Sequence, residues 1–204
     1  MSHDRAAAWA LLNEFMKNKS LINHSLSVEA AMRWYANKNA LSESEQENWG
    51  ITGLLHDFDY EMFPEPTPPN GHPFKGNSIL TERGYSQEIR DAIMGHATYT
   101  GTPRISQMAK TLFAVDELCG LVTASVLVRP DKSIHNLEAK SVLKKMKDKH
   151  FAAGCNRDDI KLGAEELGVE LSQHISNVIQ SMREIAEILG LGGITTQPLQ
   201  SATA

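Results

Sequence analysis

The stretch ITGLLHD, residues 51–57, ends a strongly apolar segment with a histidine and an aspartate. Ser42 or Ser44 lies where it can cap a helix that leads into this segment. The sequence therefore predicts a helix from about residue 42 to Asp57, and a Pro-rich loop follows it. Polar groups at the end of a buried helix need a partner, because leaving them unpaired among apolar side chains is costly.

Four more histidines and aspartates lie on either side of this stretch, on core-facing positions or at loop ends. His72 follows the Pro-rich loop 63–71 and stands where an N-cap would, with Pro73 at the first helical position. The other three continue apolar stripes at helical spacing: His24 with Leu21 and Val28, His96 with Ile89 and Ile93, and Asp116 with Met108 and Leu112. A carboxylate inside an apolar stripe costs several kcal/mol unless it is paired.

Taken singly, each of these residues has an ordinary structural explanation as a satisfied core histidine, a cap or an ion-pair partner. Together they account for four of the eight histidines and two aspartates, all on inward or loop-end positions. We therefore predict that they meet at one site. The remaining histidines are interpreted as surface or incidental residues: His3, His135, His150 and His174.

The types of donor atom narrow the choice of metal. Imidazole nitrogen and carboxylate oxygen without thiolate favour iron, manganese, zinc, cobalt or nickel. They do not fit an iron–sulfur cluster or a zinc finger. Six protein ligands exceed what one catalytic ion with an open position needs, but they fit two ions that share a bridging carboxylate. We expect a divalent metal cofactor of one or two ions.

Composition limits the other classes of function. The chain has 204 residues and a formal net charge of −5, which argues against nucleic acid as an obligate partner. The lysines between residues 140 and 149 are interpreted as a solvated helix face. The two cysteines form no CxxC pair, and no signal peptide or apolar run of about 20 residues is found. We therefore expect a cytoplasmic protein without a membrane partner, and its oligomeric state stays open.

Helical periodicity dominates the whole chain, so we predict an all-α bundle of about eight or nine helices. The expected helices cover residues 4–17, 21–37, 42–57, 72–83, 86–97, 104–128, 137–147, 157–167 and 171–189. We expect one domain over residues 1–194, with a metal-site core at about 21–127, C-terminal helices at 137–190 and a disordered tail at 195–204.

The order of the candidate ligands, His, His-Asp, His, His, Asp, resembles the HD-domain superfamily of metal-dependent phosphohydrolases. The segment GLLHD, residues 53–57, resembles the motif that names this family, and the resemblance covers about residues 21–127. The two additional histidines place the chain near the branch with six ligands, which includes bacterial dinucleoside tetraphosphate hydrolases, HD-GYP phosphodiesterases and the diiron oxygenases such as myo-inositol oxygenase. The resemblance implies an HD-domain-like helical bundle.

The resemblance also implies which residues bind metal. His24, His56, Asp57 and Asp116 would hold the first ion, and His72 and His96 would hold the second, with Asp57 as the bridge. Without His72, a site for a single ion would be favoured. Two features depart from the family pattern: Phe58-Asp59 replaces the common Ile-Gly after the His-Asp pair, and the GYP signature is absent.

The function expected from this resemblance is hydrolysis of a phosphoester or phosphoanhydride of a small metabolite, with a nucleotide favoured, by a metal-bound hydroxide. Asp57, His56 and Lys75 are the candidate catalytic residues, with Lys75 holding a substrate phosphate as a point charge. Two alternatives stay open, a diiron oxygenase with the same ligands and a non-catalytic HD-domain protein that binds a metal or another ligand. Other candidates near the site are Asp59 or Glu61 to orient a ligand histidine, Arg104 to meet an anion, and Thr98, Tyr99 and Thr100 to line the pocket.

Overall fold

The computed structural model describes residues 3–194, and over this range the chain forms ten α-helices, one short 3₁₀ helix and no β-strand. The all-α prediction is confirmed. The helices are α1 (Arg5–Phe15), α2 (Lys19–Lys38), α3 (Glu43–Leu55), α4 (Phe74–Glu82), α5 (Gln87–His96), η1 (Thr98–Thr100), α6 (Gln107–Leu127), α7 (Ala139–Met146), α8 (Arg157–Glu166), α9 (Leu171–Arg183) and α10 (Ala186–Leu189).

Most predicted helix boundaries agree with the structure to within a few residues. The predicted helix over 171–189 is divided, because α9 ends before Glu184 and α10 begins at Ala186. The tail at 195–204, expected to be disordered, lies outside the described residues. Among the described helices, none combines the length and apolar character that crossing a bilayer requires.

Polar side chains fix the starts of the helices that carry the candidate ligands. Ser42 and Glu45 form a capping box at the start of α3, in which each side chain pairs with the backbone of the other residue. Ser106 accepts a hydrogen bond from the Ala109 amide at the start of α6. The predicted N-cap at His72 is wrong by one residue, since Pro73 precedes α4 and no side chain caps that helix.

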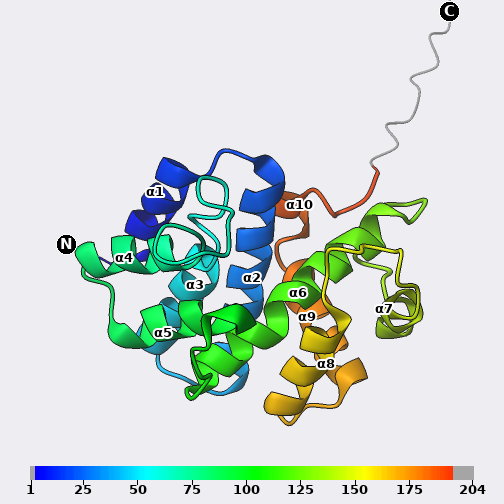
Figure 1. The fold of residues 1–204 in the computed structure, drawn as a ribbon. Coiled ribbons are helices and arrows are strands. Elements are labelled where there is room, and N and C mark those ends of the chain that lie inside the picture. The colour runs from blue at the N-terminus through cyan, green and yellow to red at the C-terminus, as the bar shows by residue number, and fades with distance from the viewer. Residues whose placement is uncertain (1–2, 195–204) are drawn as a thin grey trace, which may run out of the picture.

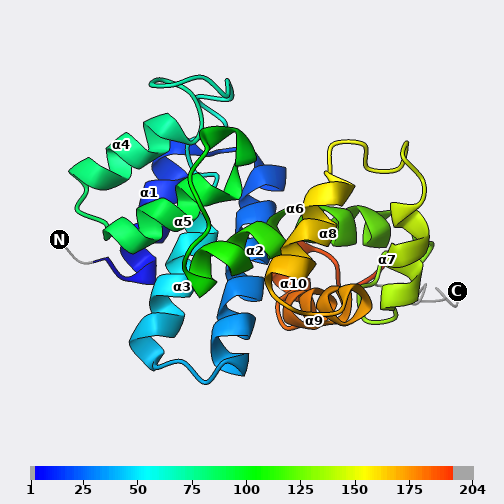
Figure 2. The same ribbon diagram turned by 60° about the horizontal axis from the view of Figure 1, so that its bottom comes forward.

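The long helix α6 runs between two groups of helices. Figure 2 shows α1 to α5 on one side of it and α7 to α10 on the other, and Figure 1 shows α2 and α6 crossing near the centre of the molecule. Helix α3 packs mainly on α2, while α5 and α8 pack on α6. One continuous hydrophobic cluster contains buried side chains from both groups.

Two glycines allow the closest helix contacts. A Cβ atom added at Gly53 would lie 2.9 Å from both the Val28 carbonyl oxygen and the Met32 side chain, so α3 can approach α2 closely only with glycine there. A Cβ added at Gly163 would lie 2.5 Å from the Ala114 Cα atom, which sets the approach of α8 to α6. The first contact brings the end of α3 beside α2, and the second brings α8 beside the middle of α6.

His174 on α9 is buried, which contradicts its interpretation as a surface or incidental residue. The Tyr35 hydroxyl donates to its Nδ1 atom over 2.7 Å, and its Nε2 atom donates to the Ala114 carbonyl over 2.9 Å. Burial lowers the pKa of this histidine, so the ring is held in the neutral form. The side chain joins α9 to both α2 and α6, at a point where sequence periodicity alone indicated no partner.

Candidate metal centre

The structure brings all six predicted metal ligands together at the ends and inner faces of different helices. His24 comes from α2, His56 and Asp57 directly follow α3, His72 precedes α4, His96 ends α5, and Asp116 lies in α6. Two groups have ligand atoms that all lie within 4.8 Å of one another, His24–His56–Asp57 and Asp57–His72–His96. Asp57 belongs to both groups, which is the position expected of a bridging carboxylate.

His56 presents one ring nitrogen to this centre. Its side chain is fully buried, and its Nδ1 atom donates a hydrogen bond to the Gly53 carbonyl over 2.8 Å. That bond leaves a lone pair on the Nε2 atom, which has no hydrogen-bond partner and lies 3.4 Å from a carboxylate oxygen of both Asp57 and Asp116. A buried acceptor that faces two anions fits a bound cation, because a cation pairs with all three groups.

His72 and His96 present their Nε2 atoms to the centre in the same way. The Nδ1 atom of His72 donates to Asp59 over 2.7 Å, and that of His96 donates to the Ile93 carbonyl. The two Nε2 atoms lie 3.3 Å apart, and each lies within 3.4 Å of Asp57 Oδ1. An outer hydrogen bond that fixes the ring and tautomer is characteristic of metal-binding histidines.

Asp116 and His24 complete the first group from two neighbouring helices. The Asp116 Oδ1 atom lies 2.9 Å from His24 Nε2 and 3.4 Å from His56 Nε2. Both side chains keep about a fifth of their surface exposed, 22% for His24 and 17% for Asp116. This side of the centre therefore faces the solvent from which a substrate or a metal ion arrives.

Without a metal ion, the negative charge of the aspartates favours protons on the histidines of this centre. Burial disfavours charge on His56, but the carboxylates of Asp57 and Asp116 outweigh it and raise the pKa of His56 well above its usual range. Burial likewise opposes protonation of His72, yet Asp57 and Asp59 raise its pKa to about 9. The pKa of Asp57 falls well below its usual range despite burial, because the charge of His56 and hydrogen bonds from His56, His72 and His96 stabilise the carboxylate. A set of nitrogen and oxygen donors that includes two carboxylates fits a divalent transition metal.

A cavity of about 500 Å³ opens beside the ligands. Its walls include Tyr60, Thr98, Tyr99 and Phe113. Of the three residues predicted to line the pocket, Thr98 and Tyr99 do so and Thr100 does not, since its hydroxyl bonds to the Met94 and Ala97 carbonyls. The Tyr99 hydroxyl donates to the His72 carbonyl over 3.0 Å, and burial raises the pKa of this tyrosine to about 12. This volume suits a small molecule rather than a macromolecular segment.

The departure Phe58-Asp59 from the family pattern has a structural explanation. The Phe58 side chain is fully buried and packs edge-on against Phe15, with ring centroids 5.3 Å apart. Asp59 accepts hydrogen bonds from His72 and from the Gly76 amide, each over 2.7 Å, so it is placed to orient the His72 ring, as predicted. The same prediction for Glu61 is wrong, because Glu61 accepts from the backbone amides of residues 17 and 18 instead.

Two residues predicted to bind a phosphate or another anion, Lys75 and Arg104, do not line this cavity. Lys75 is not among the residues that line the cavity, and its ammonium group lies over the Phe63 ring, 6.0 Å from the centroid. Arg104 forms an ion pair with Glu166 at 2.5 Å and lies over the Phe113 ring at 3.7 Å. Neither side chain is placed to contact a phosphate beside the six ligands.

Sequence reasoning missed a wall of the cavity that comes from the segment before α8. Gly154, Cys155, Asn156 and Asp159 line it, together with Glu117 of α6. Burial and the neighbouring Asp116 raise the pKa of Glu117 to about 7. The helix-capping position of Asn156 was readable from the sequence, but no sequence pattern places residues 154–159 beside Asp116.

Comparison with known proteins gives one match. A family model described as HD domain matches residues 21–121, a range that contains all six ligands. No curated protein and no solved structure matches the chain.

Proposed function

Because residues 21–121 make this chain a member of the HD-domain family, we propose that it is a metal-dependent phosphohydrolase that cleaves a phosphoester or phosphoanhydride of a small metabolite, with a nucleotide as the favoured substrate. The observation that carries the proposal is the shared position of Asp57 between two groups of ligand atoms. Two ions bridged in this way would stabilise both the attacking and the leaving oxygen of a phosphoryl displacement.

The geometry of the two groups supports an assignment of the residues that would hold the metal. His24, His56 and Asp116 would hold one ion, His72 and His96 would hold the other, and Asp57 would contact both. When bound, divalent ions acidify water and neutralise the charge that develops on the phosphoryl oxygens. The backbone carbonyls of Gly53 and Ile93 and the Asp59 carboxylate keep three histidine rings in place, so the donor atoms need little rearrangement during the reaction.

The cavity wall supports a small phosphorylated substrate. The Tyr60, Tyr99 and Phe113 side chains offer aromatic surface for a nucleobase or another flat group. The open side near His24 and Asp116 gives the reacting phosphoryl group a route to the ligands. Glu117 lies on the same wall, where its carboxyl group can donate a proton to a leaving oxygen in the half-protonated state near neutral pH.

Phosphate release from a panel of nucleotides and simple phosphoesters, with manganese, cobalt or nickel added, tests the proposal. We expect turnover by the wild type and by His150→Ala, because His150 is exposed. We expect His56→Ala to abolish both activity and metal binding. Metal-loaded protein that turns over none of the panel would contradict the proposal, and oxygen uptake with retained iron would assign oxygenase chemistry instead.

A further inference from the structure

We propose that the substrate carries a second anionic group, and that this group binds in a basic cavity between α7 and α8, on the other side of residues 154–156 from the metal centre. The inference rests on the proposed function and deepens it, since it names the substrate class as a phosphorylated molecule with two separated anionic ends.

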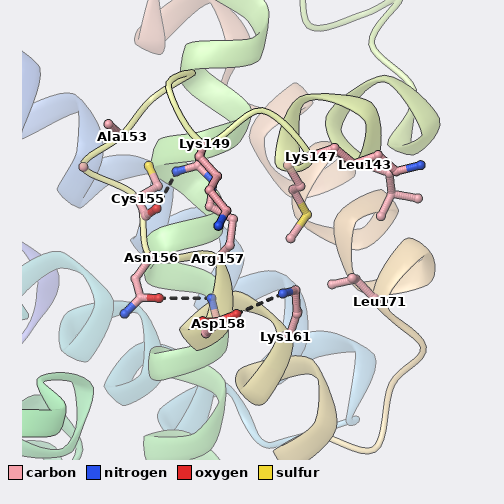
Figure 3. Close-up of a pocket in the computed structure, with 12 residues that line it drawn as sticks. Leu143, Lys147, Lys149, Ala153, Cys155, Asn156, Arg157, Asp158, Lys161 and Leu171 are labelled. Atoms are coloured by element: carbon pink, nitrogen blue, oxygen red, sulfur yellow. Dashed lines mark hydrogen bonds and ion pairs between the residues drawn. The ribbon is translucent and has the colours of Figure 1, made fainter.

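The basic cavity is larger than the one at the metal centre. Its volume is about 970 Å³, and Figure 3 shows its walls, which come from the end of α7, the segment before α8 and the start of α8 and α9. Four cationic side chains line it against a single anionic one: Lys147, Lys149, Arg157 and Lys161 against Asp158. The local excess of positive charge contrasts with the net charge of −5 for the whole chain.

The two cavities adjoin each other. Gly154, Cys155 and Asn156 line both of them, so this short segment forms a ridge with the metal centre on one side and the cationic side chains on the other. A molecule whose reacting phosphoryl group lies at the metal ligands therefore extends across the ridge into the basic cavity. The ridge comes from outside residues 21–121, so the metal-binding helices by themselves do not form it.

The cations divide into those that build the cavity and those that are free to bind. Arg157 donates to the carbonyls of Phe151, Ala152 and Cys155, so it holds the ridge segment in shape. Lys161 pairs with Asp158 at 2.9 Å. Lys147 and Lys149 are exposed and take part in no salt bridge within the described part of the chain. These two ammonium groups are the ones we assign to the second anion.

The remaining walls define the rest of the ligand. Leu143, Met146 and Leu171 add apolar surface to the cavity, and Figure 3 shows Leu143 beside Lys147. A ligand with an uncharged body and an anionic end fits these walls, because the body covers apolar surface while the anion meets the lysines. The distal anion is a phosphate or a carboxylate, since both pair with a lysine ammonium group.

Binding of non-hydrolysable alkylphosphonates to manganese-loaded protein tests the inference without requiring turnover. The probes have chains of three to eight carbons and end in a hydroxyl, a carboxylate or a second phosphonate. We expect at least one chain length at which the terminal anion strengthens binding about tenfold or more over the hydroxyl, measured by titration calorimetry at 0.15 M salt. The preferred terminal group identifies the distal anion.

Matched double variants locate the effect. Lys147→Gln with Lys149→Gln removes most of the gain from the terminal anion, whereas Lys140→Gln with Lys144→Gln, the same charge change at residues that do not line the cavity, keeps it. No gain at any chain length, or an equal loss in both double variants, would overturn the inference. Either result would leave the phosphate-release test unaffected, so the two proposals fail separately.

A bulky residue on the ridge provides a second test. A Cβ placed at Gly154 meets no atom within 4 Å outside its chain neighbours, and the φ of Gly154 is not positive, so Gly154→Trp adds a side chain to the ridge without backbone strain. We expect this variant to lose the gain that the terminal anion gives over the hydroxyl, both probes being measured on the variant itself. An unchanged gain in Gly154→Trp would show that the ligand does not cross the ridge.

Discussion

The polar side chains that matter for the proposed function are buried in the helices that carry the metal ligands and exposed in the α7–α8 region. In the first region, His56 and Asp59 are fully buried, and each is held by hydrogen bonds to its own neighbourhood. In the second region, Lys147 and Lys149 lie exposed at the rim of a large cavity. The first arrangement fixes donor atoms in advance of the reaction, which favours catalysis. The second leaves charge in solvent, which favours recognition of an anion.

The contrast predicts that the two regions respond differently to substitution. Changes among the buried groups are expected to act on metal binding and on chemistry, since each group has a fixed partner. Changes at the rim are expected to act on substrate preference alone. The Gly163–Ala114 contact and the Arg104–Glu166 ion pair hold α8 against α6 and thereby join the two regions.

The largest effect is expected at the carboxylate that both groups of ligands share. Asp57 Oδ1 lies 3.2 Å from His72 Nε2, and its Oδ2 lies 3.4 Å from His56 Nε2, so Asp57→Asn removes a charge from both sides. We expect activity to fall about a thousandfold or more and the metal-to-chain ratio to drop, measured by phosphate release and elemental analysis. Asp131→Asn, an equal charge change in the loop before α7, is the control. Full metal content in Asp57→Asn would refute the bridging role.

His174 tests how firmly the two regions are joined. His174→Phe removes the ring that accepts from the Tyr35 hydroxyl and donates to the Ala114 carbonyl, and only the bond from Asn177 to the hydroxyl stays, so we expect the free energy of unfolding to fall by about 2–4 kcal/mol. Urea denaturation of the metal-free protein measures this change, and His150→Phe at an exposed position is the control. Metal content per folded chain is expected to stay constant. A stable His174→Phe variant would contradict the importance of this connection.

A smaller effect is expected from the group that orients His72. Asp59→Asn weakens the hydrogen bond to His72 Nδ1 without removing a metal ligand. We expect metal affinity to fall about 10- to 100-fold, as found for outer partners of ligand histidines, with the loss confined to one of the two ions. Competition with a chelator measures the affinity. Glu61→Gln, two residues along the chain, is expected to bind metal as the wild type does, and an equal loss there would argue against a specific role.

The smallest effect is expected when the pH is changed by one unit and metal binding is measured. The pKa of His72 is raised to about 9 in the metal-free protein, so a proton occupies the ring below that pH and must leave before metal binds. Metal affinity is therefore expected to rise about tenfold or more per pH unit between pH 7 and 9, since His56, whose pKa is also raised, must lose its proton as well. The raised pKa also affects stability. The stability that protonated His72 contributes to the metal-free protein is fully present below pH 6.5 and is lost as the pH rises through 9. A metal affinity that is constant from pH 7 to 9 would contradict this prediction.

Much of the metal centre could be predicted from the sequence because its ligands follow helical periodicity. His24, His96 and Asp116 continue apolar stripes, and a polar residue in such a stripe must face the interior. The sequence could nominate Asp59 to orient a histidine, because it lies beside the His-Asp pair, but it could not indicate which histidine. The sequence places Lys75 one turn past His72, but it does not show that the ammonium group lies over the Phe63 ring, outside the cavity lining.

Local sequence therefore determined the helices, the inward faces and the identity of the donor atoms, because hydrophobic spacing and capping act over a few residues. Only the tertiary structure decided that His174 is a buried connection and that residues 154–156 separate the metal centre from a basic cavity. These contacts join positions far apart in the chain. They depend on how closely α3 approaches α2 and α8 approaches α6, which is set by packing at Gly53 and Gly163.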